Sequence, residues 1–167
     1  MWSKNNDIVS GSLKGLAAKV GDGDVLVPGR QKDLGRCELF PQYLRHNSRG
    51  NFVAVCGDGE YIIYTSRQLR QKTFGNGLNF TWSTEGSGDY AVRISSSRVH
   101  TFRNFEEHHQ VKPPGIATNI WGGPMLAIAS NHCVWFYDWD TCTLVRQIDV
   151  QAREIYWSDA GDRVAIC

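Results

Sequence analysis

The chain has 167 residues, which suits one domain, and about 70% of the unfolded surface can be buried at this size if the fold is complete. Its 18 Lys and Arg residues balance 17 Asp and Glu residues, so the formal net charge is only +1. This balance excludes the basic footprint of a nucleic-acid-binding domain, and we predict no nucleic-acid partner. No apolar run reaches the roughly 18 residues that a membrane-spanning helix needs.

The first 36 residues are rich in Gly, Asp, Lys and Ser and do not fit the pattern of the rest. Within them, residues 13–20 have the composition of a short helical turn and residues 25–28 that of an edge strand. The run Gly21-Asp22-Gly23-Asp24 reads as a low-complexity turn. We therefore expect residues 1–36 to form an irregular lead-in or linker.

A repeat runs through the remainder of the chain. Gly50, Gly88, Gly123 and Gly161 are separated by 38, 35 and 38 residues, and each is followed by a short apolar run. An aromatic residue stands fourteen positions after each of the first three glycines: Tyr64, Phe102 and Tyr137. Self-similarity near 40 residues, filled with short strands, is typical of the blades of a β-propeller.

Strands are predicted from runs of β-branched and aromatic residues bounded by Gly, Asn, Asp or Ser. They cover residues 39–44, 52–56, 61–65 and 70–74 in the first unit, and 78–82, 90–94, 99–102 and 106–111 in the second. The third unit carries strands within 120–129, 133–138 and 143–148, and the fourth begins at 154–158. No long period of 3.6 residues survives, so we expect little helix.

The predicted fold is all-β: an incomplete WD40-type β-propeller over residues 37–167, with about three and a half four-stranded blades. Tyr137-Asp138 lies where a WD repeat places its Trp-Asp pair, at the end of a third strand. Cys167 falls inside the second strand of a fourth blade, whereas a closed ring typically needs four to eight blades. We therefore expect a fragment of a longer protein or a truncated gene product.

Candidate catalytic groups are few. His108-His109 is the most tempting pair, but neighbours on a strand point to opposite faces, which favours a solvated edge over a shared metal. His132-Cys133 has no second ligand pair at zinc spacing. His46, Ser83 and Ser158 follow first strands, where turn hydrogen bonds explain them. We predict no catalytic, metal-binding or cofactor-binding residue.

Other features have structural explanations. The repeat alignment puts in turns most of a set of seven carboxylates: Glu38, Asp58, Glu60, Glu85, Asp89, Asp138 and Asp140. Trp82, Trp121 and Trp157 recur at the ends of first strands, which favours packing between blades over a ligand cage. The basic residues Arg67, Arg70 and Lys72 are expected on a solvated edge, and the sequon Asn79-Phe80-Thr81 inside a strand is read as a coincidence.

The number and spacing of the cysteines indicate the cellular compartment in which the protein is expected. The five cysteines, at positions 37, 56, 133, 142 and 167, are odd in number and show no C-x-x-C spacing. Together with the absence of a signal peptide, this indicates reduced thiols in the cytosol.

Several blocks of the sequence resemble one family. Residues 37–42, 46–47, 52–65 and 70–75 are similar in order and spacing to the β′-type subunit of coatomer. So are Ile120-Trp121-Gly122-Gly123, Phe136-Tyr137-Asp138-Trp139 and residues 156–161. The resemblance spans about residues 32–167 and is to the second of the two propellers of that subunit, often called the coatomer WD-associated region.

The resemblance implies a structural component of the cytosolic COPI coat, which forms on Golgi-derived vesicles and returns cargo to the endoplasmic reticulum. In that family the first propeller reads dilysine cargo signals, and an α-solenoid contacts the α subunit. Neither part has a counterpart in this sequence, so no cargo-binding residue is assigned. The implied partners are other coatomer subunits, chiefly the α subunit, with peripheral attachment to Golgi vesicle membranes.

Two further interpretations stay open at this point. One is a generic WD-repeat scaffold that binds a peptide on its open face, since repeat folds often serve as binding platforms. The other is a truncated gene product without function. An enzymatic role is disfavoured, because the Ser-x-Asp-x-Gly-x-Thr-Trp turns of sialidase-like propellers do not occur in the sequence.

Overall fold

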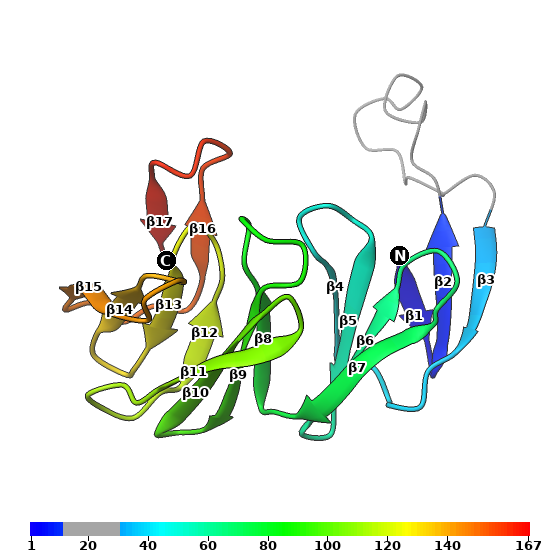
Figure 1. Cartoon of the computed structure of the whole chain (residues 1–167), viewed down its shortest axis with the longest axis horizontal. Helices are drawn as coiled ribbons and strands as arrows, with labels where there is room; N and C mark the ends of the chain where they lie inside the picture. The colour runs from blue at the N-terminus through cyan, green and yellow to red at the C-terminus, as the bar shows by residue number, and fades with distance from the viewer. Residues whose placement is uncertain (12–30) are drawn as a thin grey trace.

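The computed structural model describes residues 1–11 and 31–167, and in these ranges every regular element is a β-strand. The strands form five antiparallel sheets that lie side by side in chain order (Figure 1). The expected helical turn at 13–20, the turn at 21–24 and the edge strand at 25–28 lie outside the described residues. The all-β propeller architecture predicted from the sequence is confirmed.

Three sheets are complete four-stranded blades in which sequential strands are neighbours. The first contains β4 (Tyr43–His46), β5 (Phe52–Gly57), β6 (Glu60–Thr65) and β7 (Gln71–Asn76). The second contains β8 (Asn79–Trp82), β9 (Tyr90–Ser95), β10 (Arg98–Arg103) and β11 (Glu106–Val111). The third contains β12 (Asn119–Trp121), β13 (Leu126–Ala129), β14 (Val134–Tyr137) and β15 (Leu144–Ile148).

Two smaller sheets flank these blades. At one end, β16 (Ile155–Trp157) pairs with β17 (Val164–Ile166) as the inner two strands of a fourth blade. At the other end, β1 (Trp2–Lys4), β2 (Asp7–Gly11) and β3 (Gln31–Arg36) form a three-stranded sheet. The expectation of an irregular lead-in is therefore wrong for residues 1–11 and 31–36.

The register of the strands shows that this first sheet is part of a preceding blade. In each complete blade the pairing of third and fourth strands skips one residue, which marks a β-bulge. The skipped residues are Lys72, His108 and Val145, and the β2–β3 pairing skips Leu34 in the same way. Since these positions recur every 36 to 38 residues along the chain, β1, β2 and β3 correspond to the second, third and fourth strands of a preceding blade.

The strand predicted at residues 39–44 starts later in the structure. β4 begins at Tyr43, because Pro41 has no backbone N–H for the ladder and the preceding Phe40 stays exposed. Leu39 instead packs into the cluster between the first sheet and the first blade, together with Ile8. The other predicted strands of the first two blades match the observed ones within one or two residues.

The apolar core lies between the blades rather than in one central mass. Four clusters of buried side chains fill the four seams, and the second strands that they enclose are almost fully buried. The seam between the first and second blades is aromatic and contains Tyr61, Phe80, Trp82 and Tyr90. Each blade is thus stabilised by its neighbours, as in other repeat folds.

Candidate functional site

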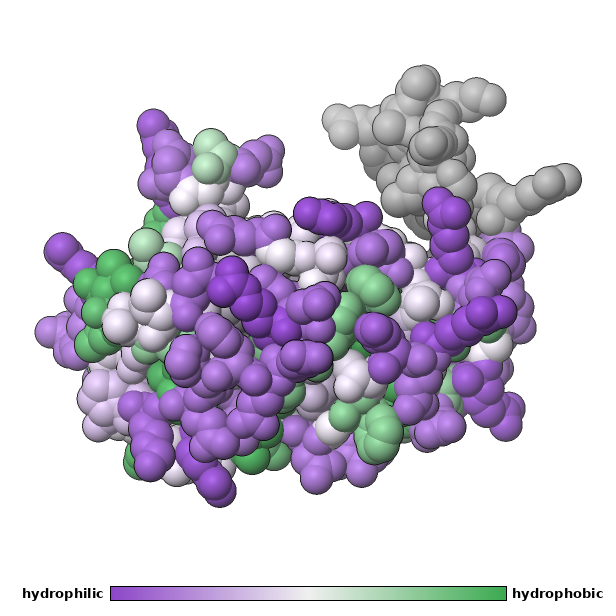
Figure 2. Space-filling view, viewed as in Figure 1, coloured by the Kyte–Doolittle hydropathy of each residue, from purple (hydrophilic) through white to green (hydrophobic). Residues whose placement is uncertain are grey.

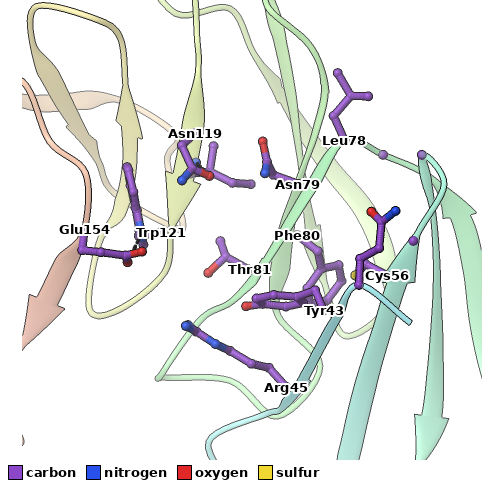
Figure 3. A pocket seen from close by; sticks show the side chains of 15 residues that line it. Tyr43, Arg45, Cys56, Leu78, Asn79, Phe80, Thr81, Asn119, Trp121 and Glu154 are labelled. Atoms are coloured by element: carbon purple, nitrogen blue, oxygen red, sulfur yellow. Dashed lines mark hydrogen bonds between the residues drawn. The ribbon is translucent and has the colours of Figure 1, made fainter. Parts of the chain in front are cut away.

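The inner strands line a cavity of about 330 Å³, and this is the candidate functional site of the described part of the chain. Figure 3 shows its walls: β4 contributes Tyr43 and Arg45, β8 contributes Asn79 and Thr81, and β12 contributes Trp121. The segment just before β16 adds Glu154. Inner strands of three blades therefore converge on one space, which no local stretch of sequence could form alone.

One wall carries an aromatic–cation pair. Tyr43 and Arg45 are two residues apart on β4, so both side chains lie on the same face of the strand. The guanidinium carbon of Arg45 lies 5.2 Å from the centre of the Tyr43 ring, within cation–π range. Burial raises the pKa of Tyr43 to about 12; the positive charge of Arg45 opposes the shift, while Cys56 and Glu154 add to it. The phenol is therefore a neutral hydrogen-bonding group at physiological pH.

The opposite wall carries a carboxylate held by an indole. Trp121 Nε1 donates a hydrogen bond of 3.2 Å to Glu154 Oε2, shown as a dashed line in Figure 3. Arg45 and Glu154 thus place opposite charges on two sides of the same cavity, with the polar side chains of β8 between them. This arrangement can bind a small polar segment by charge and hydrogen bonding.

The sequence alone does not reveal this cavity. The only local signal was the alternation of Tyr43 and Arg45 on one strand face, which is common on any half-exposed strand. The cavity arises where the inner strands of different blades converge, and each of its other lining residues looks ordinary within its own repeat.

The pair His108-His109 lies on β11, as expected, but its geometry differs from the expectation. The bulge at His108 breaks the alternation of the strand, so the two imidazole rings do not point to opposite faces. Their centroids are 4.1 Å apart, and His108 Nε2 lies 2.9 Å from the backbone oxygen of Asp140 in the next blade. The pair connects two blades, and no carboxylate joins it in a metal-binding cluster within the described residues.

The two other histidines considered as candidates, His132 and His46, lie in or beside turns between strands. His132 and Cys133 stand between β13 and β14, where Ser130 Oγ accepts hydrogen bonds from both of their backbone N–H groups. Exposed His46 ends β4, and burial of part of the ring lowers its pKa. The polar anchor at this turn is the next residue, Asn47, whose side chain reaches Ser87 in the second blade.

The serines at the equivalent turns act as predicted. Ser83 Oγ accepts a hydrogen bond of 3.3 Å from the backbone N–H of Glu85. Ser158 Oγ accepts one of 3.1 Å from Arg163 and donates one of 2.8 Å to the carboxylate of Asp162. Both hydroxyls are thus used in turn hydrogen bonding.

The recurrent tryptophans pack between blades, which confirms their predicted role. Trp82 belongs to the seam between the first two blades, and its Nε1 donates to the backbone oxygen of Arg45 over 3.1 Å. Trp157 meets Phe136 edge to face, with ring centroids 5.9 Å apart. Trp121 has a double role, since it packs against the fourth blade and also lines the cavity.

The remaining residues singled out in the sequence lie on the outer edge of a blade, on a strand or in turns. Arg67, Arg70 and Lys72 are exposed at the outer edge of the first blade, as expected. Asn79-Phe80-Thr81 lies on β8, with Phe80 and Thr81 buried. Glu60, Asp89 and Asp140 lie at or beside turns, and Asp138 Oδ1 closes one by accepting from Asp140 and Thr141. All five cysteine thiols are free.

Neither a metal centre nor a membrane span was found in the part of the chain that the structure describes. Residues 1–11 and 31–167 contain no group of three His, Cys, Asp or Glu side chains arranged to hold a metal ion. The same ranges contain no helix long and apolar enough to cross a membrane.

Solved structures share the fold at low sequence identity. The chain superposes on a hydrazine synthase from Kuenenia stuttgartiensis with a TM-score of 0.61 at 13% identity, covering 74% of this chain and 40% of that one. It superposes on the β-propeller domain of Cps50 (Swd1) from Myceliophteria thermophila with a TM-score of 0.59 at 14% identity, covering 77% and 49%. These likenesses show the propeller fold alone.

Sequence relatives are far more similar. The chain is 47% identical over 169 aligned positions to coatomer subunit β′-3 of Arabidopsis thaliana, and 44% identical over 167 to coatomer subunit β′ of Homo sapiens. These alignments cover 99% of this chain but only 18% of either relative. The family model described as the COPA/B second β-propeller matches residues 5–167. With nearly the whole chain matched, this protein belongs to the COPA/B second β-propeller family.

Proposed function

We propose that this chain is a structural module of the COPI vesicle coat and supports protein transport between the Golgi and the endoplasmic reticulum. The observation that carries the proposal is the 47% identity to a coatomer β′ subunit over 99% of the chain. The interlocked seams between blades support a role as a rigid spacer, because each blade is held by side chains of its neighbours. The chain spans 18% of those relatives, so the proposal concerns a module of a larger assembly.

In this proposal the partners are other coatomer subunits, chiefly the α subunit. The module resides in the cytoplasm and attaches peripherally to Golgi membranes and COPI-coated vesicles through the coat. It performs no reaction of its own.

A replacement experiment tests the proposal. The segment of human coatomer β′ that aligns with this chain is exchanged for residues 1–167 in cells depleted of the natural subunit. We expect the chimera to recover the α subunit in equal amounts on affinity purification and to restore retrieval of cargo to the endoplasmic reticulum. A matched chimera with Tyr90→Asp, which places a charge in the aromatic seam, should fail in both assays. A folded chimera that recovers no coatomer subunit would contradict the proposal.

One observation favours a second candidate function, a peptide-binding platform. The cavity on the inner strands is open, with Arg45 and Glu154 on opposite walls. Replacing both charged residues by Ala separates the two functions. A pure coat scaffold assembles as before, whereas a peptide-binding platform loses its bound segment and any function that depends on it.

A further inference from the structure

Large apolar side chains are exposed where the chain passes from one sheet to the next. Each of the four connections carries one, between 38% and 69% exposed: Phe40 before β4, Leu78 before β8, Ile116 before β12 and Val150 before β16. Since strands alternate in direction and the blades share one strand order, these connections lie on the same face of the fold. In the described part of the chain, the turns on the opposite face contain no exposed large apolar residue.

At the first blade, two of these connections are joined through the turn between β5 and β6. Gln42 N–H donates to the oxygen of Cys56 over 2.9 Å, and Gly77 N–H donates to the oxygen of Gly59 over 2.8 Å. Figure 1 shows both connections at the lower edge of the molecule, and Figure 2 shows hydrophobic atoms exposed there. The apolar residues of the two connections therefore belong to one continuous surface.

A groove of about 390 Å³ lies beside this turn, at the seam between the first sheet and the first blade. Leu39 and Ile62, both buried in the seam, form its apolar floor. Phe74 also lines the groove and is 69% exposed. It lies opposite Ile62 across the β6–β7 pair, so its ring extends the floor outward. The groove, together with Phe40, Phe74 and Leu78, is called here the apolar end of the first blade.

The charged side chains that border this apolar end are carboxylates. Glu38 and Glu60 line the groove, Asp58 lies in the turn, and all three are exposed. No ion pair among the described residues involves any of them. Lys72 of β7 is directed to the second blade, where its Nζ lies 5.1 Å from the centre of the Phe105 ring. A partner that covers the apolar end must therefore supply cations of its own.

Two other occupants fit this surface less well. The cytoplasmic surface of a membrane is anionic, so the three carboxylates would repel it. A second copy of the chain could offer the basic turns at the other end of the blade, with Arg49, Arg67 and Arg70. Those turns expose no large apolar side chain, so a second copy would leave Phe40 and Phe74 uncovered.

We propose that the apolar end of the first blade docks a segment of a second protein in which arginine stands beside apolar residues. One guanidinium enters the groove, where it stacks on the Phe74 ring and faces the carboxylates of Glu38 and Glu60. The adjacent apolar side chains cover Phe40 and Leu78. Arginine suits this site better than lysine, because its planar group stacks on aromatic rings and is more weakly hydrated. This inference does not depend on the proposed coat function.

The probe for a test is a fluorescent ten-residue peptide that alternates arginine with leucine, titrated into the full 167-residue chain. We expect saturable binding, with amide chemical-shift changes confined to residues 38–42, 57–62 and 71–78. Phe74→Ser should weaken binding about three- to tenfold, because the stacking surface is lost. The double variant Glu38→Gln, Glu60→Gln should weaken it by a similar factor and reduce its dependence on salt.

Matched controls make the same kinds of change elsewhere on the surface. Tyr156→Ser removes a ring that is 59% exposed, and Glu85→Gln with Glu106→Gln neutralises two exposed carboxylates. Both controls should bind the peptide like the parent chain. Thermal unfolding shows that every variant is folded, which we expect because all of the changed side chains are exposed.

Changes to the peptide test the chemistry of the partner. Lysine in place of arginine should weaken binding, and serine in place of leucine should weaken it further. The proposal is overturned if either peptide binds as tightly as the original, or if the Phe74 or Glu38–Glu60 variant binds like its control. It is also overturned if the same residues respond to phosphatidylserine vesicles or to a rising chain concentration alone, since the occupant would then be a membrane or a second copy.

Discussion

The ring of Tyr90 lies parallel to that of Phe102, with centroids 4.4 Å apart and an angle of 6° between the planes. Tyr90 is fully buried and also stacks on Phe80 at 5.0 Å, so it connects β8, β9 and β10 within one blade. Its hydroxyl lies 3.4 Å from that of Tyr61 in the preceding blade. One side chain therefore links packing within a blade to packing between blades.

Replacing Tyr90 by Ala should destabilise the fold by about 3–5 kcal/mol, because a large buried ring is removed and a cavity remains. Tyr90→Phe keeps the ring and loses only the hydroxyl contact, at a cost of about 0.5–1.5 kcal/mol. Urea unfolding of the three proteins measures both differences. Tyr156→Ala serves as the control, since that ring is 59% exposed and its loss should change stability by less than about 0.5 kcal/mol.

Gly122 is constrained by the neighbouring blade. A Cβ at this position would collide with the backbone oxygen of Trp82, and backbone atoms cannot move aside as a side chain can. Its N–H also donates a hydrogen bond of 2.6 Å to Thr81 Oγ1. We expect Gly122→Ala to cost about 1–3 kcal/mol through overpacking.

The comparison for this prediction is Gly115→Ala. An added Cβ at Gly115 meets only the ring of Trp135, at 3.0 Å, and that side chain can shift. Thermal unfolding should show a clearly larger loss for the Gly122 variant. Equal losses in the two variants would mean that the contact with the Trp82 backbone is not the source of the constraint.

Asn47 joins the first two blades through its buried side chain. Its Nδ2 donates hydrogen bonds of 2.7 Å to the backbone oxygen of Ser87 and to Asn51 Oδ1, and its Oδ1 accepts one of 3.1 Å from Phe52. Asn47→Ala leaves these groups unpaired, so we expect a loss of about 1–3 kcal/mol. Ser48→Ala, next in sequence and exposed, should be neutral in the same denaturant titration.

Asp138 is expected to make the stability of the folded state fall at low pH. Hydrogen bonds from the backbone and hydroxyl of Thr141 lower the pKa of this carboxyl below its ordinary value of about 3.9. The carboxylate therefore stabilises the fold fully above that ordinary value, and the contribution is lost as the pH falls through the lower pKa of the folded state. Asp138→Asn should flatten this part of the curve. Denaturation midpoints between pH 6 and pH 2 give the comparison, and identical slopes for both proteins would refute the assignment.

The repeat could be recognised from the sequence because each blade needs the same residue types at the same positions. Gly50 with positive φ closes a turn, apolar runs such as residues 53–55 form the buried second strand, and Tyr64 packs into the seam. These requirements act within about 40 residues, so they recur visibly along the chain. The resemblance to coatomer followed from the same blocks.

The strands of the first sheet could not be predicted from the sequence pattern. β1, β2 and β3 carry few large apolar residues, and β3 is mostly exposed, so no strong alternation marks them. Ile8 alone is fully buried there, through contact with the first blade. Only the bulge at Leu34, visible in the strand pairing, identifies this sheet as part of another blade.

The sequence by itself determined the all-β class, the blade period and the family, since these depend on local strand and turn patterns. Tertiary structure alone decided which side chains from different blades come together: Arg45 and Glu154 line one cavity, and Lys72 lies over the Phe105 ring across a seam. The physical reason is that a repeat specifies its own strands, whereas contacts between repeats depend on bulges and on how the blades are rotated against one another. The bulge at His108 illustrates this, because one extra residue brings together two rings that a regular strand would have separated.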